Sequence, residues 1–335
     1  MHERKPVIAV VIPSYRVSRH LLGVIASIGP MVQQIIVVDD ACPDGSGELV
    51  KAQCDDPRVA VLKHEVNQGV GGAVLTGYRH AIESGADIIV KVDGDGQMDL
   101  ALLPRFVAPI AAGVADYTKG NRFYDLSQIG QMPALRLLGN AGLSFMAKFS
   151  SGYWDVFDPT NGYTAIAARV ARLLPMDKIS KRYFFETDMM FRLGTFRAVI
   201  VDVPMDAKYA DEVSNLKISR VLGEFLAKHV RNFCKRIFYS YFLRDLSIAS
   251  FELVAGLLLL AFGTGFGAIE WWQGIASGVP TTAGTVMLAA MPVLVGLQLL
   301  LAFFSYDVAS VPKLSLSSRL VDAADDDADT MPKVQ

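Results

Sequence analysis

Two carboxylates separated by a single residue are the feature of this sequence most able to do chemistry. Asp93 and Asp95 stand in the stretch VKVDGDGQMD, directly after the apolar run 86–92, and Gly94 and Gly96 follow each of them. Like charges this close are stable when a cation lies beside them, and glycine permits the tight turn that aims both at one point. The oxygen ligands predict a hard divalent ion, Mg2+ or Mn2+.

Two other interpretations of the same residues are an EF-hand and a simple Asx turn. An EF-hand loop that starts at Asp93 would need glycine at its sixth position and glutamate at its twelfth, where this sequence has Met98 and Pro104. An Asx turn at the surface needs only one of the two acids, so their spacing does not exclude it. The surrounding elements must therefore decide between a metal site and a turn.

The elements around these acids predict an α/β domain. Short runs rich in Val and Ile recur with helical patterns between several of them, which predicts a parallel sheet. These runs are 7–12, 35–38, 59–62, 88–92 and 199–203. The clearest helix covers 70–82, where apolar residues share one face and Gly85 can end it. Ligands of such sheets bind at the carboxyl ends of the strands, where Asp39 and Asp40 end one run and the two spaced acids follow another.

Composition argues against several classes of site. The 335 residues are 52% hydrophobic and carry a formal net charge of -2, so no clustered basic surface for nucleic acid is expected. Cys42, Cys54 and Cys234 form no C-x-x-C pattern, so neither a disulfide framework nor a zinc site is expected. The histidines show no metal-ligand spacing, and His80 and His229, which lie in helical patterns, are expected at the surface.

The apolar excess is concentrated in two late runs. From 246 to 269 the only charged residue is Glu252, and from 283 to 306 there is none, so each run has the roughly 20 residues that a membrane helix needs. Lys and Arg are absent between Arg244 and Lys313 but occur on both outer flanks. By the positive-inside rule both termini are expected in the cytoplasm, which predicts a multi-pass protein of the cytoplasmic membrane. Two buried core helices are the alternative.

These patterns divide the chain into four parts. A cytoplasmic α/β domain is expected over 1–212, a loop and juxtamembrane amphipathic helix over 213–245, two transmembrane helices over 246–308, and an acidic cytoplasmic tail without fixed structure over 309–335. The amphipathic part combines apolar residues at near-helical spacing with Lys and Arg, so it would lie on anionic lipid. A connecting helix packed on the α/β domain is the alternative.

Five motifs occur in an order and at spacings that resemble a known family. They are VIPSY, IIVVDDACPDGSGE, NQGVGGA, VKVDGDGQ and KGNR, and neither a Walker A sequence nor a Rossmann fingerprint accompanies them. Together they resemble the GT-A domain of glycosyltransferase family 2, and within it the dolichyl- and polyprenyl-phosphate sugar synthases. The resemblance covers roughly residues 7–240, and the two spans match the bacterial branch. The implied fold is an α/β GT-A domain followed by an amphipathic helix and a two-helix transmembrane hairpin.

The resemblance also implies roles for individual residues. The implied donor-binding residues are Pro13, Tyr15, Asp39, Asp40, Asn67, Gly69, Asp93 and Gly120. The implied metal site is Asp93, Asp95 and Gln97, and the implied catalytic residues are Asp93, Asp95 and Arg122. The implied contacts of the acceptor phosphate are Arg122, Arg136, Ser214 and Lys217. Plainer interpretations stay open, because an aspartate can cap a turn and an arginine can form a surface ion pair.

Two motifs depart from the family pattern. The family has Asn and an acid after the tyrosine of its first motif, where this sequence has Arg16 and Val17, so base contacts there are open. The acceptor loop keeps Ser214 but has Tyr209 and Asn215 where the family carries arginine and lysine. The candidates for the missing charge are Lys208, Lys217 and Arg220.

The resemblance implies an inverting transfer of a hexose from a UDP- or GDP-linked sugar to polyprenyl phosphate at the cytoplasmic membrane face, for cell-envelope glycans or glycosylation. An acceptor phosphate is already ionised near neutral pH, so no base is needed, and Glu186 and Asp188 are expected to hold the donor sugar or the fold. A homo-oligomer is compatible with the exposed spans. One alternative is a polysaccharide-elongating glycosyltransferase, although Q-x-x-R-W is absent and only two spans occur. The other is a non-catalytic nucleotide-binding membrane scaffold.

Overall fold

The structure is a computed structural model that describes residues 5–124, 134–206 and 218–320, with only the backbone of 134–137 and 218–222. The chain divides into two compact units. One consists of Met1–Phe233 together with Pro312–Gln335, and the other of Cys234–Val311. Each unit is described by itself.

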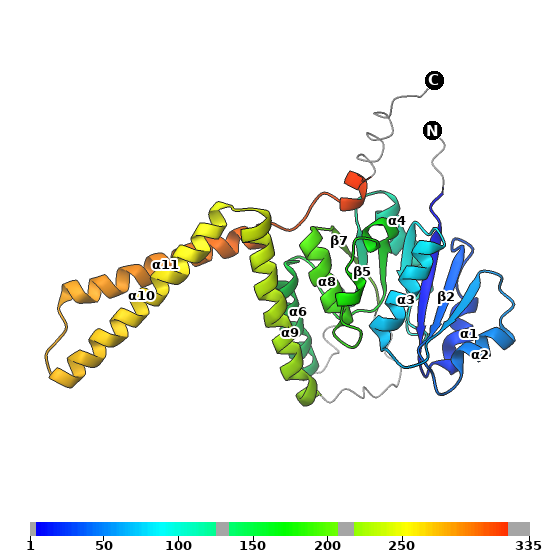
Figure 1. The fold of residues 1–335 in the computed structure, drawn as a ribbon, viewed down its shortest axis with the longest axis horizontal. Coiled ribbons are helices and arrows are strands. Elements are labelled where there is room, and N and C mark those ends of the chain that lie inside the picture. The colour runs from blue at the N-terminus through cyan, green and yellow to red at the C-terminus, as the bar shows by residue number, and fades with distance from the viewer. Residues whose placement is uncertain (1–4, 125–133, 207–217, 321–335) are drawn as a thin grey trace, which may run out of the picture. The chain divides into compact units, whose positions relative to one another are not determined.

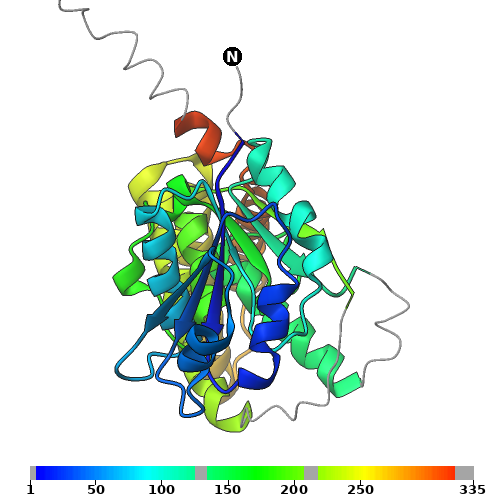
Figure 2. The same ribbon diagram turned by 90° about the vertical axis from the view of Figure 1, so that its right-hand side faces the viewer.

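The first unit is built on a seven-stranded sheet with helices on both of its faces (Figures 1 and 2). The strand order is β3-β2-β1-β4-β6-β5-β7. The strands are β1 (Ile8–Ser14), β2 (Gln34–Asp39), β3 (Val59–Lys63), β4 (Ile88–Lys91), β5 (Tyr117–Asn121), β6 (Thr164–Ala167) and β7 (Ile200–Pro204). The helices are α1 (Ser18–Ala26), α2 (Ser46–Gln53), α3 (Val70–Glu83), α4 (Leu103–Ala111), α6 (Ala134–Ser151), α7 (Ala168–Ala171), α8 (Phe185–Phe196) and α9 (Ile218–Phe238).

The predicted all-parallel sheet is wrong at one strand. β1 to β4 pair in parallel as expected, but β6 runs antiparallel to both β4 and β5, and β5 then pairs in parallel with β7. Neither β5 nor β6 was predicted, because β5 reads YTKGN and β6 has only four residues. All five strands that the apolar runs predict are present. The sheet is therefore mixed.

The predicted helix over 70–82 is α3, and it packs directly on the central strand β1. A Cβ atom added at Gly77 would lie 2.3 Å from Cγ1 of Val11, so glycine allows the backbones to approach this closely. Gly85 follows the helix with a φ of 78°, as its predicted role in ending the helix requires. The strand β1 is buried along its whole length, which is typical of a central strand covered on both faces.

The chain returns to the first unit after residue 311. The backbone N–H groups of Leu316 and Ser317 each donate to the Asp116 carboxylate at 2.7 Å, and Asp116 is fully buried. The Ser315 hydroxyl donates to the Gly113 carbonyl at 2.5 Å. Residues 312–320, at the start of the predicted tail, are therefore held against the rest of the first unit. The acidic stretch beyond them lies outside the described residues.

The second unit is a helical hairpin. A π-helical turn at Tyr239–Arg244 leads from α9 into α10 (Ile248–Ser277), and α11 (Ala283–Ala309) follows. Both α10 and α11 are long and apolar enough to cross a membrane. Arg236 and Asp307 form a buried bidentate ion pair with N–O distances of 2.6 and 3.1 Å, and the Tyr241 hydroxyl donates to the same carboxylate at 2.5 Å. This ion pair ties the entrance of the hairpin to its exit.

Candidate active site

The residues predicted to bind the donor lie at one edge of the sheet. The strands β1, β2 and β4 are parallel neighbours, so their carboxyl ends lie side by side. Asp39 is the last residue of β2, Asp40 follows it, and the D-x-D loop (residues 93–97) comes two residues after β4. Pro13 is buried inside β1, whereas Tyr15 just beyond the strand is 42% exposed. Only Tyr15 of this first motif therefore presents a side chain on which a base could stack.

Arg16, which departs from the family pattern, gives the first loop an unusual backbone. Its φ is 59°, in the left-handed region that few residues other than glycine adopt. Its backbone N–H donates to the Cys42 sulfur at 3.1 Å, and its guanidinium lies 5.5 Å from the centre of the Tyr15 ring. The guanidinium lies over the ring, and this cation–π contact helps to hold the exposed tyrosine in place.

Asp39 and Asp40 are both buried, and both carboxylates are engaged by the protein. Asp39 accepts the backbone N–H groups of Cys42 at 2.7 Å and Gly47 at 2.8 Å. Asp40 accepts the backbone N–H groups of Gln68 and Gly69, each at 2.8 Å. The two acids thus hold the loop that follows β2 and the loop that follows β3, and their direct contact with a nucleoside stays a prediction.

His64 is a site residue that sequence reasoning missed. Its Nδ1 lies 2.7 Å from the Asp40 carboxylate and its Nε2 lies 3.0 Å from the Thr76 hydroxyl, with the ring buried. The residue follows β3 in KHEVNQG, and no histidine spacing marks it there. It links the acid at the end of β2 to the helix α3.

The donor loop 67–69 is fixed by close contacts. Asn67 donates through its side-chain amide to the Asp40 carbonyl at 3.2 Å. Gly69 has a φ of 86°, and a Cβ there would lie 2.5 Å from the Lys181 carbonyl oxygen. A larger residue would therefore clash with the backbone of the segment before α8, which explains why glycine occupies this position.

The D-x-D loop lies at the same carboxyl edge of the sheet and carries two carboxylates. Asp95 is half-buried and its carboxylate accepts the backbone N–H of Gln97 at 3.0 Å, which is an Asx turn. Gly96 has a φ of 76°, as this tight turn requires. Asp93 is 30% exposed, and its carboxylate lies 3.0 Å from the ammonium of Lys91. An Asx turn and a metal site can therefore both be present, because the Asx turn fixes the conformation of the loop that carries the two carboxylates.

The oxygen ligands of this loop fit a hard divalent ion only in part. Two carboxylates and the amide oxygen of Gln97 suit Mg2+ or Mn2+. Across residues 5–124, 134–206 and 218–320, no cluster of three or more His, Cys, Asp or Glu residues could hold a metal by itself. The remaining ligands would have to be phosphate oxygens and water, as is usual for an ion bound together with a nucleotide.

The structure separates the two acids of the ETD sequence. Glu186 accepts from the Lys91 ammonium at 3.2 Å and so lies beside the D-x-D loop. Asp188 is buried on α8, where it accepts the Ser180 backbone N–H at 2.8 Å and the Asn232 amide at 3.0 Å. Glu186 therefore lies beside the loop that is predicted to bind the donor, whereas Asp188 connects α8 to α9.

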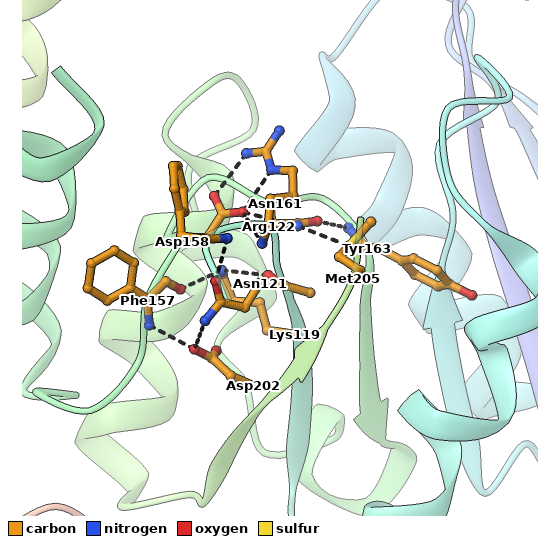
Figure 3. A network of polar contacts seen from close by, with 11 residues as sticks. Lys119, Asn121, Arg122, Phe157, Asp158, Asn161, Tyr163, Asp202 and Met205 are labelled. Atoms are coloured by element: carbon orange, nitrogen blue, oxygen red, sulfur yellow. Dashed lines mark hydrogen bonds and ion pairs between the residues drawn. The ribbon is translucent and has the colours of Figure 1, made fainter. Parts of the chain in front are cut away.

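A polar network surrounds the end of β5, where the resemblance implies the sequence G-x-R (Figure 3). Arg122 donates to Asp158 through Nε at 2.7 Å and Nη2 at 2.8 Å, and its own backbone N–H donates to the same carboxylate at 3.2 Å. Asp158 is fully buried and has a φ of 48°. A Cβ at Gly120 would lie 2.4 Å from the Met205 sulfur, so a larger residue here would have to displace that side chain. The predicted phosphate-binding arginine is thus oriented by an aspartate that sequence reasoning missed.

A buried lysine lies beneath this arginine (Figure 3). Lys119 is 1% exposed, and its ammonium donates to the Phe157 carbonyl at 3.1 Å. Burial lowers the pKa of Lys119 to about 8, although Asp158 and Asp202 oppose this shift. Burial also raises the pKa of Asp202, which accepts from the Asn121 amide at 3.0 Å. The pKa of Lys119 and the pKa of Asp202 therefore each depend on the charge of the other group.

The predicted acceptor-phosphate residues are described only in part. Arg122 is described, and Arg136 belongs to α6, but the Arg136 side chain is outside the described atoms. Ser214 and Lys217 lie in 207–217, outside the described residues, so the acceptor loop stays a prediction. The expected surface position of His229 is wrong, because its ring is buried and its Nδ1 lies 2.9 Å from the Ser150 hydroxyl.

Part of the chain is similar to known proteins. Residues 9–173 match the family described as glycosyl transferase family 2. Undecaprenyl-phosphate mannosyltransferase of Micrococcus luteus is 35% identical over 173 residues, which are 51% of this chain and 70% of that protein. UDP-N-acetylglucosamine--dolichyl-phosphate N-acetylglucosaminyltransferase of Methanococcus voltae is 28% identical over 218 residues, which are 61% of this chain and 86% of that protein. Among solved structures, glucosyl-3-phosphoglycerate synthase from Mycobacterium tuberculosis has a TM-score of 0.49 and 20% identity, covering 69% of this chain and 80% of that one.

Proposed function

Because the chain belongs to glycosyltransferase family 2 and is therefore a glycosyltransferase, we propose that it moves a hexose from a nucleotide sugar to polyprenyl phosphate. Both relatives are named after an isoprenoid phosphate, although the sugars in the two names differ. The acceptor class is thus the common element on which the proposal rests, and the donor is left to experiment.

One observation carries the proposal. The D-x-D loop lies at the carboxyl edge of the parallel strands β1, β2 and β4, and the donor loop 67–69 follows β3, which is parallel to β2 in the same sheet. In sheets of this kind nucleotides bind at that edge. The exposed Tyr15 suits the base, and the acids of the D-x-D loop suit a metal–diphosphate complex.

We assign the divalent ion to Asp95 and Gln97, with Asp93 next to them. Asp93 already shares its charge with Lys91 at 3.0 Å, so Asp95 is the stronger ligand of the pair. When bound, the ion neutralises the charge that grows on the leaving nucleoside diphosphate. The loop contributes by fixing the direction of that leaving group through the turn between Asp95 and Gln97.

The acceptor needs to be positioned rather than deprotonated. A lipid monophosphate is substantially ionised near neutral pH, so its oxygen can attack the anomeric carbon directly and one displacement inverts that carbon. Two anions repel each other on approach, and a bidentate arginine offsets this repulsion. Arg122 is the described candidate because Asp158 fixes its guanidinium, and Arg136, Ser214 and Lys217 complete the proposed acceptor site.

The membrane face follows from the hairpin and its flanks. The helices α10 and α11 suit two spans, and Arg244 and Lys313 lie just outside them. The positive-inside rule then places both termini and the catalytic unit in the cytoplasm. In a variant without the three native cysteines, a cysteine introduced at Val279 is expected to react with a membrane-impermeant maleimide in intact cells. Reaction only after lysis would reverse the proposed orientation.

The direct test is a lipid-labelling assay. Membranes that contain the protein are incubated with undecaprenyl phosphate, Mn2+ or Mg2+, and a panel of radiolabelled UDP- and GDP-sugars, and the label in the organic phase is counted. Metal-dependent label from one donor is the expected result, and it would also identify the sugar. If a donor instead builds a polymer or is only hydrolysed, the acceptor assignment fails and a polysaccharide synthase takes its place.

A further inference from the structure

A buried lysine connects the two acidic elements of the donor site. Lys91 is the last residue of β4 and is 1% exposed. Its ammonium lies 3.0 Å from the Asp93 carboxylate and 3.2 Å from the Glu186 carboxylate. One nitrogen thus joins the loop after β4 to the first turn of α8.

The energetics require these partners. Removing a charged lysine side chain from water costs free energy unless its charge is paired and hydrogen-bonded. Burial alone would lower the pKa of Lys91, but the charges of Asp93 and Glu186 outweigh it and hold the pKa above its ordinary value. The same pairing removes much of the repulsion between two carboxylates that contact one nitrogen.

The surrounding backbone is shaped to admit this ion pair. A Cβ added at Gly162 would lie 2.5 Å from the Lys91 nitrogen and 2.6 Å from a carboxylate oxygen of Asp93. Gly162 stands just before β6, the antiparallel strand next to β4. The glycine thus leaves the space that the charged atoms occupy. Glu186 lies in the first turn of α8, where the helix dipole also favours a negative charge.

We propose that Lys91 is a positioning residue that binds Asp93 to Glu186 and thereby presents the D-x-D loop to the metal–diphosphate part of the donor, an inference that rests on the proposed transferase function. Glu186 then belongs to the donor side of the site. Without Lys91, the Asp93 and Glu186 carboxylates would repel each other, and the D-x-D loop would lose the position in which it is presented to the metal–diphosphate. The loss should therefore appear in metal-dependent nucleotide binding before any sugar is transferred.

The test compares two variants of the full-length protein in detergent. Lys91→Met removes the charge with little change in length, and Lys91→Met/Glu186→Gln also removes one unpaired carboxylate. The control is Lys148→Met, which removes a half-buried lysine that donates to the Trp154 carbonyl on another part of the domain. Binding of UDP and of GDP is measured by calorimetry with Mn2+ and with EDTA. Unfolding temperatures are measured without ligand.

Lys91→Met is expected to weaken Mn2+-dependent nucleotide binding at least tenfold and to leave binding in EDTA within twofold. The double variant is expected to recover at least threefold, and to unfold at a higher temperature than Lys91→Met. The control is expected to bind within twofold of the native protein. Recovery in the double variant separates repulsion from general damage, because a second lesion in a merely structural residue would not restore affinity.

Two sets of results would overturn the proposal. Lys91→Met with native Mn2+-dependent affinity would show that the lysine does not act on the donor site. A double variant that unfolds no higher than Lys91→Met would refute the ion pair, whether or not a nucleotide binds. Failure of the transferase proposal looks different, since the native protein would then bind nucleotide with the same Lys91 dependence but label no lipid.

Discussion

Replacing Asp158 with asparagine tests whether the network around Arg122 holds that arginine in place. Asparagine has nearly the same shape and tolerates the left-handed backbone of residue 158, whose φ is 48°. The substitution therefore removes the negative charge without straining the chain. Its amide oxygen can still accept one of the two side-chain hydrogen bonds from Arg122, but its NH2 group would face the other donor.

The magnitude follows from the burial of the pair. The Asp158 side chain is 0% exposed and that of Arg122 is 32% exposed. A hydrogen bond to a charged group contributes about 1.5–3 kcal/mol, and breaking a fully buried pair costs about 3–5 kcal/mol. Because Arg122 keeps partial access to water and one hydrogen bond remains, we expect a loss of about 2–3 kcal/mol. For a domain of this size that corresponds to a decrease of roughly 5–10 °C in Tm.

The assay is thermal unfolding of the full-length protein in detergent, followed by transfer kinetics. Asp177→Asn is the matched control, because Asp177 pairs with Arg79 at 2.8 Å while 95% of its side chain is exposed. Exposed pairs contribute about 0–1 kcal/mol, so the control should change Tm by no more than about 3 °C. We also expect kcat/KM of Asp158→Asn to fall by roughly 10- to 100-fold, since a mispositioned arginine loses bidentate contact. Equal Tm values for Asp158→Asn and the native protein would refute the reasoning.

Three further predictions address the metal, pH and packing. Asp95→Ala should leave Tm unchanged and reduce metal-dependent transfer by at least about 100-fold, and near-normal turnover would contradict the metal assignment. Burial lowers the pKa of His229 from 6.5 to about 4, so the unfolded chain binds this proton first and stability falls as the pH drops from about 6.5 toward 4. Between pH 7.5 and pH 5 this contributes a loss of at most about 2 kcal/mol, which His229→Gln should remove from the pH dependence of Tm. Gly77→Ala should destabilise the protein by about 1–3 kcal/mol through its clash with Val11, whereas Gly23→Ala, with no atom within 4 Å, should be neutral or slightly stabilising.

The sequence predicted the part of the fold in which apolar residues and burial coincide. The strands β1 to β4 and β7 are Val- and Ile-rich, and α3 shows one apolar face, so each could be recognised locally. The strand β5 could not, because Lys119 and Asn121 are polar residues that the tertiary structure buries. The direction of β6 could not either, since strand pairing is a long-range property that four residues do not encode.

For the candidate site, the sequence indicated individual motif residues better than it indicated the side chains that contact them. The D-x-D loop, Asp39, Asp40 and Arg122 were singled out from their motifs, and their roles stay predictions. Their partners Lys91, His64 and Asp158 were not, since each acts through a side chain far away in the sequence, as Lys91 does with Glu186. A buried ionic partner has no local signature, because neither periodicity nor spacing distinguishes it from a surface charge.

The return of residues 312–320 to the catalytic unit makes the hairpin an insertion in the chain of that unit. The Asp116 carboxylate receives its hydrogen bonds from Leu316 and Ser317 about 200 residues after it is synthesised. During translation both apolar helices must therefore leave the ribosome before the domain can satisfy this buried acid. Completion of the enzyme is thus ordered in time: the nascent domain acquires its last buried contacts only after its hydrophobic segments are available to the membrane.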